Sequence, residues 1–248
     1  ENDEAVAKEI NYRGWQGLKQ GRVHADEFVG DYIRAVFHTV MLKDIVERNN
    51  IRNVSFLNTL LRYFADTIGK LSSLNNISKF MKSQGLDVSV KSIAAYLNYF
   101  RDAYLLLTVD RFDIHGKKLL ESNEKIYFGD VGLRNLIAGG ERQGDIEKIL
   151  ENIVYQQLVR MGYAVSVGQL RVGEVDFVCT KSNERLYVQV AYLIASEETE
   201  EREFGSLDNI KDNYPKYVIS MTPLVRRSDR QGVVHLGLRE FLKNGFEK

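Results

Sequence analysis

Residues 173–191 read GEVDFVCTKSNERLYVQVA, and this stretch decides the fold. Two short runs rich in β-forming residues, 173–179 and 185–191, flank a polar break. The pattern predicts a β-hairpin with a loop of four or five residues. Successive side chains of a strand point to opposite faces, so Glu174 and Asp176 are expected on one face of the first strand. Acidic side chains inside apolar strands are costly unless they are paired or hold a metal, so the hairpin is where we look for chemistry.

The sequence around the hairpin predicts an α/β domain over residues 123–248. Apolar residues recur at helical spacing over residues 145–161, and this expected helix carries Glu151 toward the hairpin. A second helix is expected over residues 197–213, followed by a strand at 216–221. The resulting order is helix, three antiparallel strands, helix and strand.

Residues 54–122 predict a helical domain that ends in a hairpin. Three helices are expected, and the second and third begin at the capping residues Ser73 and Ser89. A hairpin follows over residues 104–120. Three helices followed by a two-stranded wing is the order of a winged helix-turn-helix domain. Residues 1–53 are expected to form a helical connector that precedes it.

The predicted winged helix carries a mild excess of positive charge, with nine basic and six acidic residues. Its third helix offers few of the arginine side chains that read base edges. Winged helices also dock proteins, so DNA and a protein partner both stay open as ligands. For DNA, the expected phosphate contacts are made by Lys79, Lys82, Lys91, Lys117 and Lys118.

The bulk composition excludes several classes of protein. The 248 residues include 34 Lys and Arg against 34 Asp and Glu, so the whole chain has no net field that would attract nucleic acid. The absence of a long apolar run predicts no membrane segment. The lone Cys179 predicts a reducing compartment, so a cytoplasmic protein is expected.

The hairpin resembles the core of the PD-(D/E)XK nuclease superfamily, whose fold is that of restriction endonucleases. By position, Asp176 matches the metal-binding Asp, Gln189 the second-strand Glu or Gln, and Ala191 the Lys. Glu151 matches a Glu that such sites often carry on the preceding helix. The resemblance implies a degenerate catalytic set of Glu151, Asp176 and Gln189, and weak Mg²⁺ binding by Asp176 with Glu151 or Glu174. The catalytic Lys is absent, which favours a retained scaffold without hydrolytic activity; in an active site, a Lys or Arg from the next helix, such as Arg202 or Lys211, would have to substitute for it.

A closer resemblance covers residues 40–245 and is carried by several motifs in the same order. YFGDVGLRN at 127–135, LENIVY at 150–155 and VQVAYL at 188–193 are similar to the C-terminal domain of unknown function in prokaryotic AAA-type ATPases. In that family a P-loop ATPase module precedes this region. The chain begins at Glu1 and contains no GxxxxGK[ST] motif, so the resemblance implies a piece of a longer protein whose ATP site lies in another module.

Two functions from different classes remain. In the first, the chain is a non-catalytic recognition or regulatory module that contacts DNA or a protein and couples this binding to its own N-terminal ATPase module. In the second, it is a Mg²⁺-dependent DNA endonuclease whose catalytic lysine has moved. Whether the chain is an enzyme therefore stays open at this point.

Overall fold

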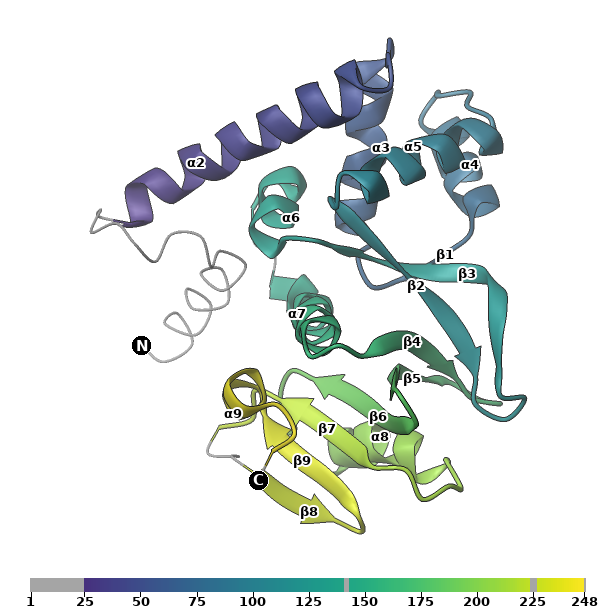
Figure 1. The fold of residues 1–248 in the computed structure, drawn as a ribbon, viewed down its shortest axis with the longest axis vertical. Helices are drawn as coiled ribbons and strands as arrows, with labels where there is room; N and C mark the ends of the chain where they lie inside the picture. The colour runs from purple at the N-terminus through teal and green to yellow at the C-terminus, as the bar shows by residue number, and fades with distance from the viewer. Residues whose placement is uncertain (1–24, 141–142, 224–226, 248) are drawn as a thin grey trace. The chain divides into compact units, whose positions relative to one another are not determined.

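The computed structural model describes residues 25–140, 143–223 and 227–247, and the chain divides into two compact units (Figure 1). The first unit comprises residues 1–108 and 126–142, and the second comprises residues 109–125 and 143–248. Strands β2 (Leu106–Asp113) and β3 (Lys118–Phe128) contribute residues to both units.

The two units differ from the three parts expected at 1–53, 54–122 and 123–248, and residues 1–24 of the expected helical connector lie outside the described residues. The expected boundary after residue 122 lies inside β3, which continues through Asn123. Asn123 adopts a φ of +61°, a left-handed conformation that Asn tolerates better than most residues. The polar sequence at residues 121–124 therefore marks a backbone irregularity within one strand.

The first unit is mainly helical. Asn53, Ser73 and Ser89 cap three of its helices by accepting hydrogen bonds from Phe56 N, Asn76 N and Ser92 N, so both predicted serine caps are confirmed. Strands β1, β3 and β2 are neighbours in the sheet, in that order. The remaining elements of the first unit are α2 (Ala25–Thr39), the π-helix η2 (Val40–Glu47), α3 (Val54–Asp66), β1 (Leu71–Ser72), α4 (Leu74–Ser83), α5 (Val90–Asp102) and α6 (Val131–Ala138).

The core of the first unit is aromatic and contains a fully buried arginine. Phe64 of α3 packs edge-on against Phe100 of α5, with ring centroids 6.3 Å apart. Arg134 of α6 donates from Nε to the carbonyl oxygen of Ala65 at 2.9 Å. This hydrogen bond ties α6 to the end of α3 and satisfies a carbonyl oxygen in the last turn of that helix.

The second unit is a mixed sheet covered by helices, and the expected α/β class is confirmed. Its strands follow the order β3-β2-β4-β5-β6-β7-β9-β8. The pairs β2–β4, β6–β7 and β7–β9 are parallel, whereas β4–β5, β5–β6 and β8–β9 are antiparallel. Its remaining elements are η3 (Gln143–Asp145), α7 (Ile146–Arg160), β4 (Ala164–Gln169), β5 (Glu174–Lys181), β6 (Glu184–Ala191), α8 (Glu197–Asp208), β7 (Lys216–Ser220), β8 (Arg227–Arg230), β9 (Val233–Gly237) and α9 (Leu238–Asn244).

The predicted hairpin is formed by β5 and β6, but its turn is tighter than expected. Lys181 pairs with Glu184, so only two residues lie between the strands instead of four or five. Ser182 takes a φ of +53°, which is the left-handed conformation that short hairpin turns require.

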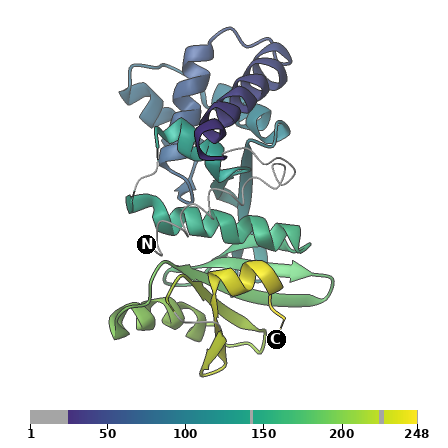
Figure 2. The same cartoon turned by 90° about the vertical axis from the view of Figure 1, so that its left-hand side faces the viewer.

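Helices α7 and α8 cover opposite faces of this sheet. Phe177 of β5 packs against Tyr155 of α7, with ring centroids 6.0 Å apart. The neighbouring Val178 belongs to a cluster with Phe204 and Leu207 of α8. Because neighbouring strand residues point to opposite faces, the two helices lie on opposite sides. Figure 2 shows α7 in green and α9 in yellow on the face turned toward the viewer.

Gly129 provides a test of the packing in the first unit. A Cβ added there would lie 2.1 Å from the carbonyl oxygen of Tyr104, a backbone atom that cannot turn away. We expect Gly129→Ala to lower the free energy of unfolding by about 3 kcal/mol in denaturant titrations. The matched change Gly205→Ala, in α8, meets no atom within 4 Å and should raise stability by about 1 kcal/mol. Equal effects of the two changes would contradict this packing.

Candidate functional site

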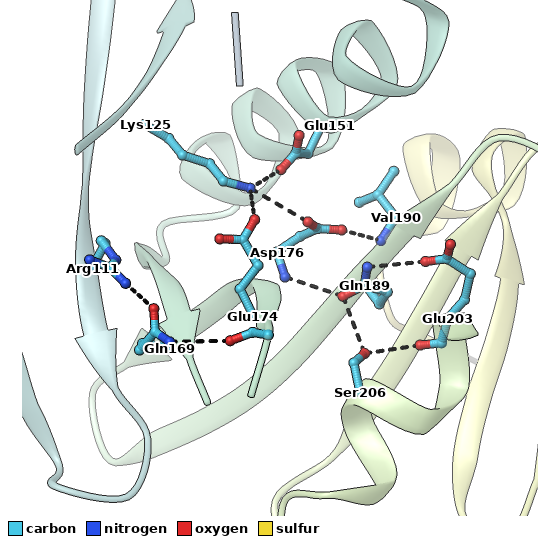
Figure 3. Close-up of polar contacts among 11 residues, drawn as sticks. Arg111, Lys125, Glu151, Gln169, Glu174, Asp176, Gln189, Val190, Glu203 and Ser206 are labelled. Atoms are coloured by element: carbon cyan, nitrogen blue, oxygen red, sulfur yellow. Dashed lines mark hydrogen bonds and ion pairs between the residues drawn. The ribbon is translucent and has the colours of Figure 1, made fainter. Parts of the chain in front are cut away.

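Lys125 lies at the centre of a cluster of three carboxylates in the second unit (Figure 3). Its Nζ lies 2.6 Å from Glu151 Oε1, 2.7 Å from Glu174 Oε1 and 3.6 Å from Asp176 Oδ1. The Lys125 side chain is only 3% exposed, whereas that of Glu174 is 36% exposed. The cluster is therefore a buried ion group that opens to solvent on the Glu174 side.

Three elements bring these residues together. Lys125 comes from β3, Glu151 from the buried face of α7, and Glu174 and Asp176 from the start of β5. The expectation that Glu174 and Asp176 point to the same side agrees with their shared contact to Lys125.

An irregularity in β5 explains how Asp176 reaches α7. Ser166 of β4 pairs with Val178, but Gly168 pairs with Val175, so two residues of β5 oppose one residue of β4. Such a bulge turns a side chain away from its regular direction. Phe177 and Asp176 therefore both make contacts on the α7 side, with Tyr155 and with the Lys125 cluster respectively.

Both carboxylate oxygens of Asp176 have a polar partner. Oδ2 accepts a hydrogen bond from Val190 N at 2.8 Å, while Oδ1 faces Lys125. The backbone N–H of Asp176 donates to Oε1 of Gln189 at 3.3 Å. The carboxyl group is thus fixed between the next strand and the ammonium group (Figure 3).

Gln189 serves a different set of contacts. Its Nε2 donates to Glu203 Oε2 of α8 at 3.1 Å, and its Oε1 accepts from Asp176 N. Glu203 in turn accepts from Arg202 Nε at 2.8 Å. Gln189 therefore connects β5 to α8, and its amide oxygen is directed at a backbone N–H.

The electrostatics of the cluster follow from burial and from the excess of acids over bases. Burial alone would lower the pKa of Lys125, but Glu151, Asp176 and Glu174 outweigh it and hold that pKa above its ordinary value. Burial, together with the nearby Glu151, raises the pKa of Asp176 well above its ordinary value, although Lys125 and the N–H of Val190 oppose this. Lys125 thus stays charged, and three carboxyl groups compete for one ammonium.

With Lys125 in place, the cluster does not fit a metal ion. Carboxylate oxygens are suitable ligands for Mg²⁺. However, the described residues contain no group of three His, Cys, Asp or Glu arranged to hold a metal. The three carboxylates expected to bind Mg²⁺ instead face the ammonium of Lys125.

The structure thus brings together Glu151, Glu174 and Asp176 and directs Gln189 elsewhere. The sequence interpretation missed Lys125. Neither suggested substitute for the lysine absent at Ala191 supplies the ammonium here, because Arg202 pairs with Glu203 and Lys211 donates to the carbonyl oxygen of Asp208. The one sequence signal for Lys125 is a charged residue at the start of the apolar run Ile126-Tyr127-Phe128, and local spacing does not connect that run to the hairpin.

The five lysines expected to contact phosphates are divided between the units. Lys79 and Lys82 on α4 and Lys91 on α5 are exposed in the first unit. Lys117 and Lys118 are exposed at the β2–β3 turn, in the second unit. Lys82 also lies 3.4 Å from the carboxylate of Asp87, which partly offsets its charge.

Removal of the central ammonium should be more damaging than removal of one acid. We expect Lys125→Met to lower the free energy of unfolding by about 3–5 kcal/mol, because three carboxylates stay buried without a counter-charge. Asp176→Asn should cost less than half as much, since it relieves the excess of acids and keeps an oxygen for Val190 N. The control Lys181→Met removes an exposed lysine that donates to Met161 O and should have little effect. Denaturant titrations measure all three, and an Asp176→Asn loss equal to that of Lys125→Met would contradict the proposed excess of acids.

Among the described residues, no helix is long and apolar enough to cross a membrane. Two curated relatives match most of the chain. An uncharacterized protein of Haemophilus influenzae is 37% identical over 199 residues, which are 80% of this chain and 49% of that protein. The uncharacterized protein MJ1544 of Methanocaldococcus jannaschii is 30% identical over 192 residues, covering 75% of this chain and 41% of its own length. The chain therefore spans about half the length of the curated relatives it matches, or less.

Among solved structures, the crystal structure of protein VC1899 from Vibrio cholerae matches 76% of this chain and 54% of its own. The identity is 13% and the TM-score 0.27, a likeness too low to carry an argument. A family model described as a domain of unknown function, DUF8612, matches residues 20–144, which is half of the chain. On this match, the chain belongs to the DUF8612 family.

Proposed function

We propose that this chain is a non-catalytic, DNA-contacting module of a longer ATPase, built on a nuclease-like α/β scaffold. The observation that carries the non-catalytic part is the position of Lys125. Its ammonium is close to all three carboxylates that the nuclease resemblance would use for a metal. A hydrolytic metal site needs those oxygens for a divalent cation, and here they already have a counter-charge.

The order of elements in the second unit supports the nuclease-like scaffold. Helix α7, the meander β4-β5-β6, helix α8 and strand β7 follow the order expected from the resemblance, and β7 pairs in parallel with β6. The acids Glu151 and Asp176 occupy the matching helix and strand. The scaffold is thus proposed to be retained while the chemistry is lost.

The order of elements from α3 to β3 supports contact with DNA. Along the chain the elements follow the order α3, β1, α4, α5, β2 and β3. In the sheet the three strands are neighbours in the order β1-β3-β2. This arrangement fits a winged helix, in which α5 would enter the major groove. Lys91 is exposed at the second residue of α5, where the helix dipole also favours a phosphate.

The association with an ATPase rests on the resemblance and on length. The chain spans 49% and 41% of the two curated relatives, which leaves room for another module in proteins of that kind. ATP would then bind outside this chain, and the DNA-contacting part would report to that module.

Nicking of supercoiled plasmid tests the non-catalytic role. We expect no nicking by the wild type with Mg²⁺ or Mn²⁺, and none by Asp176→Asn, because the metal-binding oxygens face Lys125. Circular dichroism of both proteins controls for folding. Nicking by the wild type that disappears in Asp176→Asn would refute the non-catalytic role.

A second candidate is a Mg²⁺-dependent endonuclease with a displaced lysine. The observation that favours it is again Lys125, since its ammonium lies 3.6 Å from Asp176, whereas this chain has Ala191 at the position that the resemblance assigns to the catalytic lysine. In this case Lys125 would stabilise charge near a scissile phosphate. Nicking by the wild type that is lost in Lys125→Met as well as Asp176→Asn would support this second candidate.

Binding to a DNA duplex tests the recognition role. Lys91→Glu should weaken binding about tenfold and reduce the slope of log K against log salt by about one, because one phosphate contact is lost. Lys43→Glu changes an exposed lysine of η2 and serves as the matched control. Fluorescence anisotropy over a series of salt concentrations gives both quantities. A folded wild type that binds no duplex would instead favour a protein partner.

A further inference from the structure

We propose that Lys125 acts as a built-in counter-cation that keeps divalent metal out of the acidic cluster, and that removal of its ammonium creates a site for Mg²⁺ or Mn²⁺. This inference deepens the proposed non-catalytic role and rests on it. It concerns the same carboxylates of Glu151, Glu174 and Asp176, and it attributes their failure to bind a divalent metal ion to the ammonium of Lys125.

The geometry places the ammonium where the carboxylates converge. Oxygens of Glu151 and Glu174 approach Nζ to 2.6 and 2.7 Å, and Asp176 Oδ1 lies at 3.6 Å. They come from a helix and a strand whose positions are set by the core around Phe177 and Tyr155. A cation that replaced the ammonium would therefore meet oxygens already brought together.

The charges explain why two cations do not share the cluster. A divalent ion beside Lys125 would lie within a few ångströms of a like charge in a buried site, where repulsion is weakly screened. Once the ammonium is removed, three carboxylates are left with no counter-charge, and a hard divalent cation becomes the natural partner. Methionine at position 125 would keep most of the apolar stem and supply no charge.

The cluster also has a route for a cation. Glu174 is 36% exposed, whereas the side chains of Glu151 and Asp176 are 11% and 12% exposed. An ion entering past Glu174 would meet the buried acids next. Asp176 Oδ2 would stay bonded to Val190 N, so Oδ1 is the oxygen available to a metal.

Thermal unfolding of the full chain in MgCl₂ and MnCl₂ tests the proposal. The melting temperature of Lys125→Met should rise by about 5–10 °C at a metal concentration roughly 100 times its Kd, while the wild type should not respond. Lys125→Met with Glu151→Gln lacks one proposed ligand and should lose most of the response. Lys181→Met retains the cluster and should behave as the wild type. Direct titration calorimetry with Mn²⁺ on the same proteins reads binding independently of stability.

Each outcome bears on the inference. A metal response of the wild type equal to that of Lys125→Met would overturn it, because the ammonium would then not exclude the ion. A Lys125→Met protein that neither binds Mn²⁺ nor folds in its presence would overturn it as well. The titrations contain no DNA, so they are read separately from plasmid nicking. Wild-type nicking would refute the proposed function even if Lys125→Met gained a metal site.

Discussion

The contact of one ammonium with three carboxylates is the constraint on which the centre of the second unit depends. Glu151, Glu174 and Asp176 lie close together in a region where water screens charge poorly. Without Lys125 their mutual repulsion would oppose the packing of α7 against the start of β5, which the core around Phe177 and Tyr155 maintains. With Lys125, the same charges hold β3, α7 and β5 to a common point. The burial of Lys125 is thus tolerated because it is paired, and the burial of the acids is tolerated for the same reason.

The choice of an amide at position 189 follows from the same arrangement. Gln189 accepts from Asp176 N and donates to Glu203 Oε2, so it uses both ends of its side chain. A glutamate there would keep the first contact but would set its carboxylate against that of Glu203. The neutral Gln189 on β6 therefore connects β5 to α8 through its two hydrogen bonds. Its divergence from a metal-binding carboxylate is explained by its neighbours, without reference to catalysis.

Local features of the fold were predictable from the sequence, whereas the central ion group was not. Ser73 and Ser89 act on the backbone three residues further along, so a short window of sequence contains the whole interaction. The β5–β6 hairpin is likewise local, and only its turn length was wrong. Lys125 lies on β3, which is the neighbour of β2 in the sheet. The parallel pairing of β2 with β4 joins segments more than fifty residues apart and so brings Lys125 near Glu151 and Asp176. The alternation of apolar residues and the helix-capping residues contain no information about such a pairing. They also do not predict the bulge in β5 that redirects Asp176.

The position of Lys125 on β3 gives the ion cluster a structural role in addition to the pairing of its charges. Lys125 is the last residue of β3 in the second unit, and Ile126 is the first in the other unit. The ion group therefore holds β3 beside one of the three places where the chain passes from one unit to the other, after residues 108, 125 and 142. A lysine needed only to neutralise acids could come from any neighbouring element. Its location on β3 means that loss of its charge would affect both the acidic cluster and the attachment of this strand to α7 and β5, whereas a lysine on α8, such as one replacing Arg202, would not attach β3.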